Sequence, residues 1–240
     1  MRILGIETSS PRGSVALLDG EKAICCLEHD RENAHGESML PLVEQALASA
    51  GWLRSQLDRI AVGVGPGSFT GLRVGIALAL GLGEGLQIPV VGVPSLKAMA
   101  LAVPAGRAGS RCVLVDARKG ELFVAAYDAS GAELLPVQLV APAAVAGICQ
   151  VLQNPVFVGN GAELAPAQAA VLRGPDTDYP HARWVALEGR TAAVGGLVHP
   201  LYVRDAGAVV PRLPENPLRT VETPAAGSPI KPGTAAPESA

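Results

Sequence analysis

The chain has 240 residues, of which 49% are apolar, and its formal net charge is −3. A chain of this length and composition buries a sizeable core, so we expect a globular protein. The negative balance supplies no positive field for a phosphate backbone, which argues against direct binding of nucleic acid.

The first segments predict β-structure. Residues 3–6 and 14–18 are short apolar runs, and the Ser, Pro and Gly of residues 7–13 favour a turn between them, so we expect a hairpin. A third strand is expected over residues 22–27. Glu7 comes before any long apolar region develops, which argues against a secretory signal.

Two helices frame the next strand. Apolar residues at spacings of three and four predict a helix over residues 37–50, which Gly51 ends. A strand over residues 60–64 leads into a glycine-rich loop and a helix over residues 69–86. This second helix is apolar on nearly every side and therefore needs a second burying surface. Its charges and glycines argue against a membrane span, which needs about 20 predominantly apolar residues.

The second half of the chain repeats the opening pattern. After a strand and short helix over residues 89–101, a Gly/Pro/Ala hinge leads to strands at residues 112–116 and 121–127. Two halves that each begin with a hairpin indicate a duplicated α/β lobe. Helical patterns follow at residues 162–172 and 191–199. We predict lobes at 1–103 and 104–210, and a disordered tail over 211–240, where few large apolar residues occur.

The glycine-rich loop is the first candidate binding site. Gly65, Gly67 and Ser68 stand between a strand and a helix, where backbone N–H groups and a helix N-terminus can hold an anion. No Walker or dinucleotide motif is present, so a tight structural turn is an equal alternative. Glu7 and Thr8, in the first hairpin turn, could also face a phosphate, although polar residues are ordinary in such turns.

Other chemistry finds little support. Asp116 ends a buried strand, where it could face a cleft or satisfy the amides of its own turn. His29, His35, His181 and His199 include no pair at metal-ligand spacing, and His29 and His35 belong in or beside a surface loop. The four cysteines form no Cys-x-x-Cys unit and suit a reducing cytosol. We therefore assign no catalytic residue and no metal ligand.

Several segments together resemble one family. They are Ile3-Leu-Gly-Ile-Glu-Thr-Ser9, His35-Gly36 with Leu40-Pro41, Gly65-Pro-Gly-Ser-Phe-Thr-Gly-Leu-Arg-Val-Gly75, Gly92-Val-Pro-Ser-Leu96, Asp116-Ala-Arg-Lys-Gly-Glu121 and Pro200-Leu-Tyr-Val-Arg204. In order and spacing these segments are similar to the TsaB (YeaZ) family, a glycoprotease-like group, over residues 1 to about 205. The resemblance implies an α/β fold with two actin-like (ASKHA, RNase H-like) lobes, each a mixed sheet with helices.

The resemblance also implies a function. TsaB-like proteins are cytoplasmic, catalyse nothing alone and activate a TsaD-like paralogue, which with a TsaE-like ATPase transfers threonylcarbamoyl to N6 of the adenosine beside the tRNA anticodon. ATP is then used by the complex, no cofactor is expected on this chain, and tRNA is contacted only indirectly. TsaD places a His-x-x-x-His pair after the strand that follows the glycine loop, whereas residues 94–100 here contain no histidine. A metalloprotease is therefore disfavoured.

The resemblance points to an interface between helices. TsaB-like proteins dock on TsaD through the helices that correspond to residues 37–50 and 69–86, which would explain the surplus apolar surface, and a homodimer is expected when the partner is absent. The residues expected at this interface are Leu42, Val43, Leu47, Ile76 and Leu80. The alternative function is an actin-fold ATPase or small-molecule kinase acting alone through Glu7, Asp116 and the glycine loop.

Overall fold

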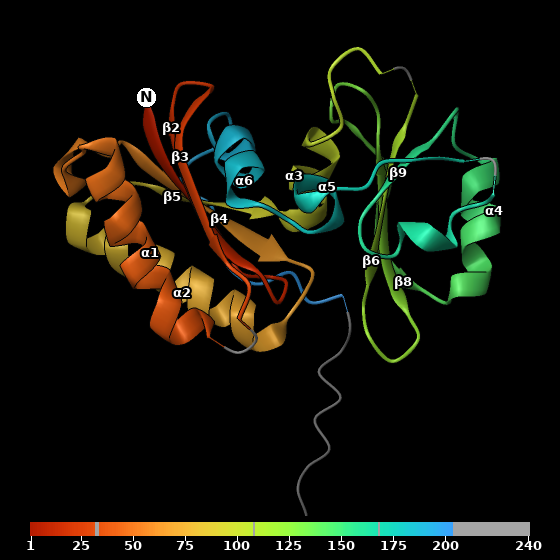
Figure 1. Cartoon of the computed structure of the whole chain (residues 1–240), viewed down its shortest axis with the longest axis horizontal. Coiled ribbons are helices and arrows are strands. Elements are labelled where there is room, and N and C mark those ends of the chain that lie inside the picture. The colour runs from red at the N-terminus through yellow and green to blue at the C-terminus, as the bar shows by residue number, and fades with distance from the viewer. Residues whose placement is uncertain (32–33, 108, 168, 204–240) are drawn as a thin grey trace, which may run out of the picture. The chain divides into compact units, whose positions relative to one another are not determined.

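A computed structural model describes residues 1–203, with the exception of 32, 33, 108 and 168. For residue 149 it describes the backbone but not the side chain. Figure 1 shows its helices and strands. The tail predicted over residues 211–240 and Arg204 of the closing motif lie outside the described residues.

The first lobe is built on a mixed five-stranded sheet with the order β3-β2-β1-β4-β5. β1, β2 and β3 form an antiparallel meander, while β4 runs parallel to β1 and β5 parallel to β4. The opening hairpin and the third strand are confirmed. The strands are β1 (Arg2–Glu7), β2 (Gly13–Asp19), β3 (Lys22–His29), β4 (Arg59–Gly65) and β5 (Val90–Pro94).

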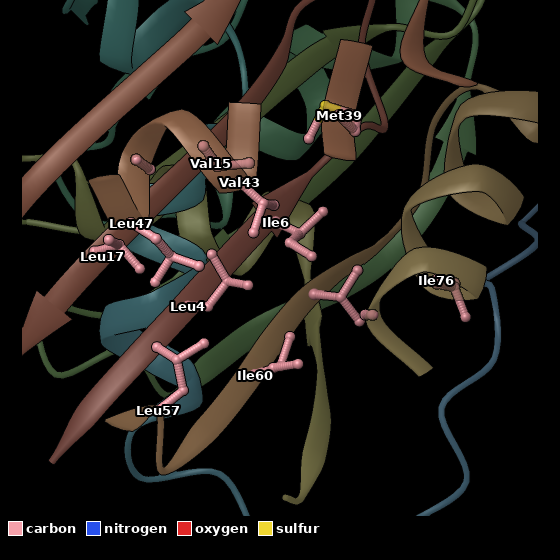
Figure 2. Close-up of a cluster of buried hydrophobic side chains, with 13 residues drawn as sticks. Leu4, Ile6, Val15, Leu17, Met39, Val43, Leu47, Leu57, Ile60 and Ile76 are labelled. Carbon is pink, nitrogen blue, oxygen red and sulfur yellow. The ribbon is translucent and has the colours of Figure 1, made fainter. Parts of the chain in front are cut away.

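Two long helices cover one face of this sheet (Figure 1). They are α1 (His35–Ala50) and α2 (Phe69–Leu86); a 3-10 turn, η1 (Arg54–Gln56), follows α1, and α3 (Ser95–Leu101) follows β5. Apolar residues of β1, β2, α1, β4 and α2 fill the space between helices and sheet (Figure 2). α1 ends at Gly51, whose left-handed backbone (φ 65°) returns its N–H to the last helical carbonyls.

The second lobe repeats the mixed sheet with the order β10-β9-β6-β7-β8. β6, β7 and β8 are antiparallel, and β9 and β10 extend the sheet in parallel. The duplicated α/β architecture is thus confirmed. The elements are β6 (Arg111–Asp116), β7 (Leu122–Tyr127), β8 (Glu133–Val140), η2 (Pro142–Ala144), α4 (Val145–Gln150), β9 (Val156–Val158), η3 (Ala162–Leu164), β10 (Ala170–Val171), α5 (Pro175–Asp178) and α6 (Ala182–Gly189).

Two predicted helices in this half are wrong. The described residues of 162–172, which leave out 168, form only the turn η3 and the short strand β10, because Ala165 precedes Pro166 and takes an extended backbone (ψ 153°), as the residue before a proline prefers. Residues 191–199 contain no helix, and the left-handed Gly195 (φ 94°) lies within them. The helix is instead α6, which ends at Gly189 before this segment begins.

α6 belongs spatially to the first lobe, although the predicted boundary placed it in the second. It packs on the face of the first sheet opposite α1 and α2, against β1, β2 and β4 (Figure 1). The approach is close: a Cβ on Gly5 would collide with the carbonyl oxygen of Ala182. Arg59 closes the far end of α6 by donating from Nη1 to the carbonyl oxygens of Gly189, Arg190 and Ala192 at 2.8, 3.1 and 3.0 Å.

α2 would be long and apolar enough to cross a bilayer by length and composition alone. In the structure its inner face packs on β4 and β1, and Ser68 caps its N-terminus by accepting a hydrogen bond from the Gly71 N–H at 3.2 Å. The inner face consists largely of small residues, while Phe69 and Leu80 on the outside are 44% and 43% exposed. Leu78, Leu82 and Leu86 pack against the core of the first lobe as well, so Phe69 and Leu80 are the large apolar side chains of α2 that stay exposed in the described part of the chain.

Candidate functional site

The tip of the first hairpin is buried, which is unusual for a polar turn. Glu7 and Thr8 are 0% exposed, and Ser9 and Ser10 are nearly as inaccessible. The Glu7 carboxylate accepts a hydrogen bond at Oε1 from the Ser9 N–H (2.6 Å) and at Oε2 from the Ser95 hydroxyl (2.8 Å). Both of its oxygens are therefore held by the chain itself, as a buried carboxylate requires.

Ser95 connects three elements at this point. It begins α3, and its Oγ also accepts a hydrogen bond from the Gly65 N–H at 3.1 Å. A relay thus runs from the end of β4 through Ser95 to Glu7 at the end of β1. A Cβ on Gly63 would collide with the Glu7 carboxylate, so this glycine makes the space in which the acid lies.

The glycine-rich loop packs against the same hairpin tip. The Ser68 N–H donates to the Ser9 carbonyl oxygen at 2.7 Å. A Cβ on Gly67 would collide with the Ser9 carbonyl, one on Gly71 with the Thr8 carbonyl, and one on Gly75 with the Thr8 hydroxyl. Because these glycines have no side chain, the hairpin tip can pack directly against the loop and the first turns of α2. The contacts support the interpretation of the loop as a tight structural turn.

Five of the six candidate binding residues come together here. Glu7 is linked to Gly65 through Ser95, and Thr8 contacts the glycines of α2 directly behind the loop that contains Gly65, Gly67 and Ser68. The sixth, Asp116, belongs to the second sheet, where its carboxylate accepts a hydrogen bond from the Arg118 N–H at 2.8 Å. Asp116 thus has the turn-forming contact that the sequence offers as its alternative role.

A pair of histidines supports the outer side of the hairpin tip. His35 is 7% exposed; its Nε2 lies 3.0 Å from the Ser10 carbonyl oxygen and its Nδ1 lies 3.1 Å from His29 Nε2. A carbonyl only accepts, so His35 Nε2 carries hydrogen; with both rings neutral, His29 Nε2 then donates to His35 and His29 Nδ1 accepts from the Arg31 N–H at 3.3 Å. The expectation of an ordinary surface histidine is wrong for His35.

His181 is a buried titratable group on the opposite side of the sheet. It caps α6, where its Nδ1 accepts a hydrogen bond from the Arg183 N–H at 3.1 Å. Burial lowers the pKa of His181 below its ordinary value, and the carboxylates of Asp176, Glu28 and Glu7 oppose this effect only in part. The ring is therefore neutral in the folded protein near pH 7.

Acid is expected to destabilise the protein through His181. The pKa of His181 is lower in the folded protein than in the unfolded chain, so below about pH 6.5 the unfolded chain takes up a proton more readily than the folded one. The contribution of neutral His181 to the free energy of unfolding is therefore fully present above about pH 6.5. It is lost as the pH falls through the folded-state pKa. His181→Asn keeps an acceptor for the Arg183 N–H and should lose less stability between pH 7.5 and 5.5, measured by urea unfolding. His199→Asn, at an exposed histidine, is the control. Parallel pH profiles for wild type and His181→Asn would contradict this assignment.

The predicted interface residues divide into two groups. Val43, Leu47 and Ile76 are only 1%, 4% and 6% exposed, and Figure 2 shows them within the core between helices and sheet. These three side chains are used by the chain's own core, because the apolar stripe of an amphipathic helix packs first on the helix's own sheet. Leu42 is half-buried and Leu80 is exposed, so these two stay available to a partner.

The chain matches known proteins over much of its length. The family model described as "TsaD: tRNA N6-adenosine threonylcarbamoyltransferase" matches residues 29–176, more than half of the chain. The "tRNA threonylcarbamoyladenosine biosynthesis protein TsaB" of Escherichia coli is 36% identical over 133 residues, which cover 53% of this chain and 55% of that protein. The protein of the same name from Bacillus subtilis is 33% identical and is covered to the same extent. The chain thus spans about half the length of the curated relatives it matches.

Solved structures extend the likeness to both lobes. A Pseudomonas aeruginosa protein described as similar to peptidase YEAZ superposes with a TM-score of 0.73 at 28% identity, covering 85% of this chain and 99% of that one. The activator of a 2-hydroxyisocaproyl-CoA dehydratase from Clostridium difficile, at 11% identity and a TM-score of 0.50, shares the fold alone. The predicted actin-like fold is confirmed, and this chain belongs to the TsaB (YeaZ) family.

Proposed function

We propose that this chain is a non-catalytic subunit that binds and activates a TsaD-like partner for threonylcarbamoyl transfer to N6 of the adenosine beside the tRNA anticodon. The pathway is supported by the names of the relatives, which are tRNA threonylcarbamoyladenosine biosynthesis proteins. In this proposal the chain works in the cytoplasm, a TsaE-like ATPase completes the complex, the complex uses ATP, and tRNA reaches this chain only through its partners.

The observation that best supports a non-catalytic role is the burial and hydrogen bonding of the Glu7 carboxylate. This is the acidic residue of the opening hairpin, where an actin-fold ATPase acting alone would need a carboxylate open to its ligand. Here the carboxylate is fully buried, and Ser9 and Ser95 occupy both oxygens. The neighbouring glycines are packed against Thr8 and Ser9. The hairpin tip and the glycine loop thus serve a structural purpose, because their contacts hold β1, β4 and α2 together.

The partner surface in this proposal is the outer side of α1 and α2. Leu40 on α1 and Leu80 on α2 are 45% and 43% exposed, and Leu42, two residues after Leu40 on α1, is half-buried. Exposed leucines on neighbouring helices are the kind of apolar surface that a partner subunit removes from water. The inner sides of the same helices are already buried against the sheet.

The test is reconstitution of tRNA modification from purified components. We expect modification by a TsaD-like partner and a TsaE-like ATPase to require this chain. Leu80→Glu should abolish co-purification with the partner and lower the modification rate at least about tenfold, because a carboxylate would be buried at the interface. Leu134→Glu, at a leucine of β8 that is 53% exposed, is the matched control and should change neither.

Two outcomes would sink the proposal. One is full modification without this chain. The other is tight ATP binding by the isolated protein in calorimetry, combined with loss of that binding on Glu7→Ala, which would instead favour the ATPase or kinase that acts alone. The circular dichroism spectrum of each variant shows whether the fold is intact before its activity is interpreted.

A further inference from the structure

A cavity of about 320 Å³ lies beside α3, where this helix packs against α6 and β7. Residues of β5, α3, β7, β8 and α6 line it, and its lining includes no residue of α1 or α2, of the first hairpin tip or of the glycine-rich loop. Its volume is at the lower end of the range of about 300–1,000 Å³ that is typical of pockets for small ligands. The cavity is therefore separate from every surface described above.

Tyr127 forms a buried wall of this cavity. The residue is only 2% exposed, and it belongs to the core cluster that α3 shares with the second sheet. Within the described residues, the Tyr127 hydroxyl has no hydrogen-bond partner. Buried hydroxyl groups are nearly always hydrogen-bonded, because losing water without a replacement partner is costly. The hydroxyl therefore needs a partner inside the cavity.

The Tyr127 hydroxyl is available as a hydrogen-bond donor. Burial, and after it the carboxylates of Glu133 and Glu188, raise the pKa of Tyr127 above its ordinary value. The hydroxyl thus keeps its hydrogen near pH 7. A molecule in the cavity can satisfy it with an oxygen that accepts this hydrogen.

The charged groups around the cavity leave one negative charge unbalanced. Lys97 Nζ lies 2.6 Å from Glu188 Oε1, so these two charges neutralise each other. Glu133 is the register partner of Tyr127 on the neighbouring strand, which places both side chains on the same face of the sheet. Across the part of the chain that the structure describes, Glu133 has no ion-pair partner. A cation would balance it.

The turn between β7 and β8 gives the cavity a fixed edge. Asp128 Oδ1 accepts hydrogen bonds from the Ser130 N–H at 2.8 Å and from the Ala132 N–H at 2.9 Å. Gly131 takes the left-handed backbone that this turn requires (φ 86°), and both Gly131 and Ala132 line the cavity. A wall that is already ordered loses little conformational entropy when a ligand binds.

We propose that this cavity binds a small hydroxylated primary amine. Its ammonium group lies against the Glu133 carboxylate, and one of its oxygens accepts the hydrogen bond of the Tyr127 hydroxyl. An amino acid fits less well, because its carboxylate would face Glu133 while Lys97 is already paired with Glu188. Among the described residues no three side chains are grouped as metal ligands, which disfavours a metal ion.

The experiment uses the full chain labelled with 3-fluorotyrosine. The chain has three tyrosines, Tyr127, Tyr179 and Tyr202, so fluorine-19 NMR should show three resonances, and Tyr127→Phe identifies one of them by its loss. The probe is 2-amino-1,3-propanediol in phosphate buffer near pH 7. It should shift the Tyr127 resonance saturably, with a dissociation constant of about 1 mM, which its few non-hydrogen atoms can supply. Glycerol, which has a hydroxyl in place of the amine, should bind at least about tenfold more weakly.

Three variants test the charge assignment through the same resonance. Glu133→Gln removes the unpaired carboxylate and should raise the dissociation constant of the probe at least about tenfold. Lys97→Gln leaves Glu188 unpaired and should lower it at least about threefold, because the cavity becomes more negative. Glu84→Gln, on α2 outside the cavity, is the matched control and should leave it unchanged. Circular dichroism checks the fold of each variant.

The inference is overturned if the probe produces no saturable shift of the Tyr127 resonance at concentrations up to about 20 mM, well above the expected constant. Equal binding of glycerol, or L-serine binding as tightly as the probe, would overturn the assignment of a hydroxylated amine. So would a Glu133→Gln variant that binds like the wild type. These measurements need no partner protein, and the proposed function stands or fails independently of them.

Discussion

Gly75→Val is expected to lower the free energy of unfolding by about 3 kcal/mol, at the upper end of the usual cost of overpacking. The new Cβ would overlap the hydroxyl of Thr8, a residue that is itself fully buried. To remove this overlap, α2 would have to move away from the hairpin tip, and this movement would also disturb the glycine-rich loop before the helix. Helix propensity alone predicts the opposite sign, since valine is a better helix former than glycine. Packing therefore decides the outcome.

The control for Gly75 is a second glycine on the same helix. A Cβ on Gly81 meets no atom within 4 Å, so Gly81→Ala should raise the free energy of unfolding by up to about 1 kcal/mol through helix propensity. Urea unfolding at low protein concentration measures both variants. Equal effects at the two positions would show that the contact between hairpin and helix does not contribute as the geometry indicates.

Ser95→Ala is expected to lower the free energy of unfolding by about 3 kcal/mol, because one hydroxyl satisfies two buried groups. Without it, Glu7 Oε2 loses its donor and the Gly65 N–H loses its acceptor. A buried carboxylate without its donor is the costlier of the two. Ser49→Ala, at an exposed position of α1, should instead be neutral or slightly stabilising.

The relay itself can be separated from the loss of a serine by a double-mutant cycle. Glu7→Gln and Ser95→Ala act on the same hydrogen bond, so their combined effect on unfolding should be smaller than the sum of the two single effects. Thermal or urea unfolding of the four proteins gives the coupling energy. Strict additivity would mean that Glu7 and Ser95 stabilise the fold independently.

Sequence patterns predicted the strands and helices of residues 2–101 well because each of these elements has a local signal. The helix over residues 69–86 was predicted with the bounds that the structure shows, since Ser68 caps it and a strand end precedes it. α6 was missed because its buried residues are mostly small, as in Ala182 and Ala186, and give a weak periodic pattern. Its packing on the first sheet depends on contacts distant in sequence, which no local pattern encodes.

The candidate site was predicted only in part, because some of its residues have a local signal in the sequence and others are brought in by contacts distant in sequence. Glu7, Thr8 and the glycine loop stand out locally because polar turns and glycines are distinctive. Ser95 does not, since a serine at the start of a helix is an ordinary residue, and its contact with Glu7 spans 88 positions. The burial of Val43, Leu47 and Ile76 could not be separated from an interface role, because an apolar stripe does not reveal what covers it.

The position of α6 affects how the protein folds during synthesis. The strand residues Ile3, Ala16 and Leu18 lie in the buried cluster to which α6 contributes Ala182, Val185 and Ala186 and α3 contributes Ala98, and α6 makes most of the helix contacts on this face of the first sheet. The part of this face that α6 covers therefore stays exposed to water until the ribosome has made residues 182–189, long after the sheet itself is complete. The newly made first half carries an uncovered apolar surface in this interval, and a fragment that ends at residue 103 would keep it permanently.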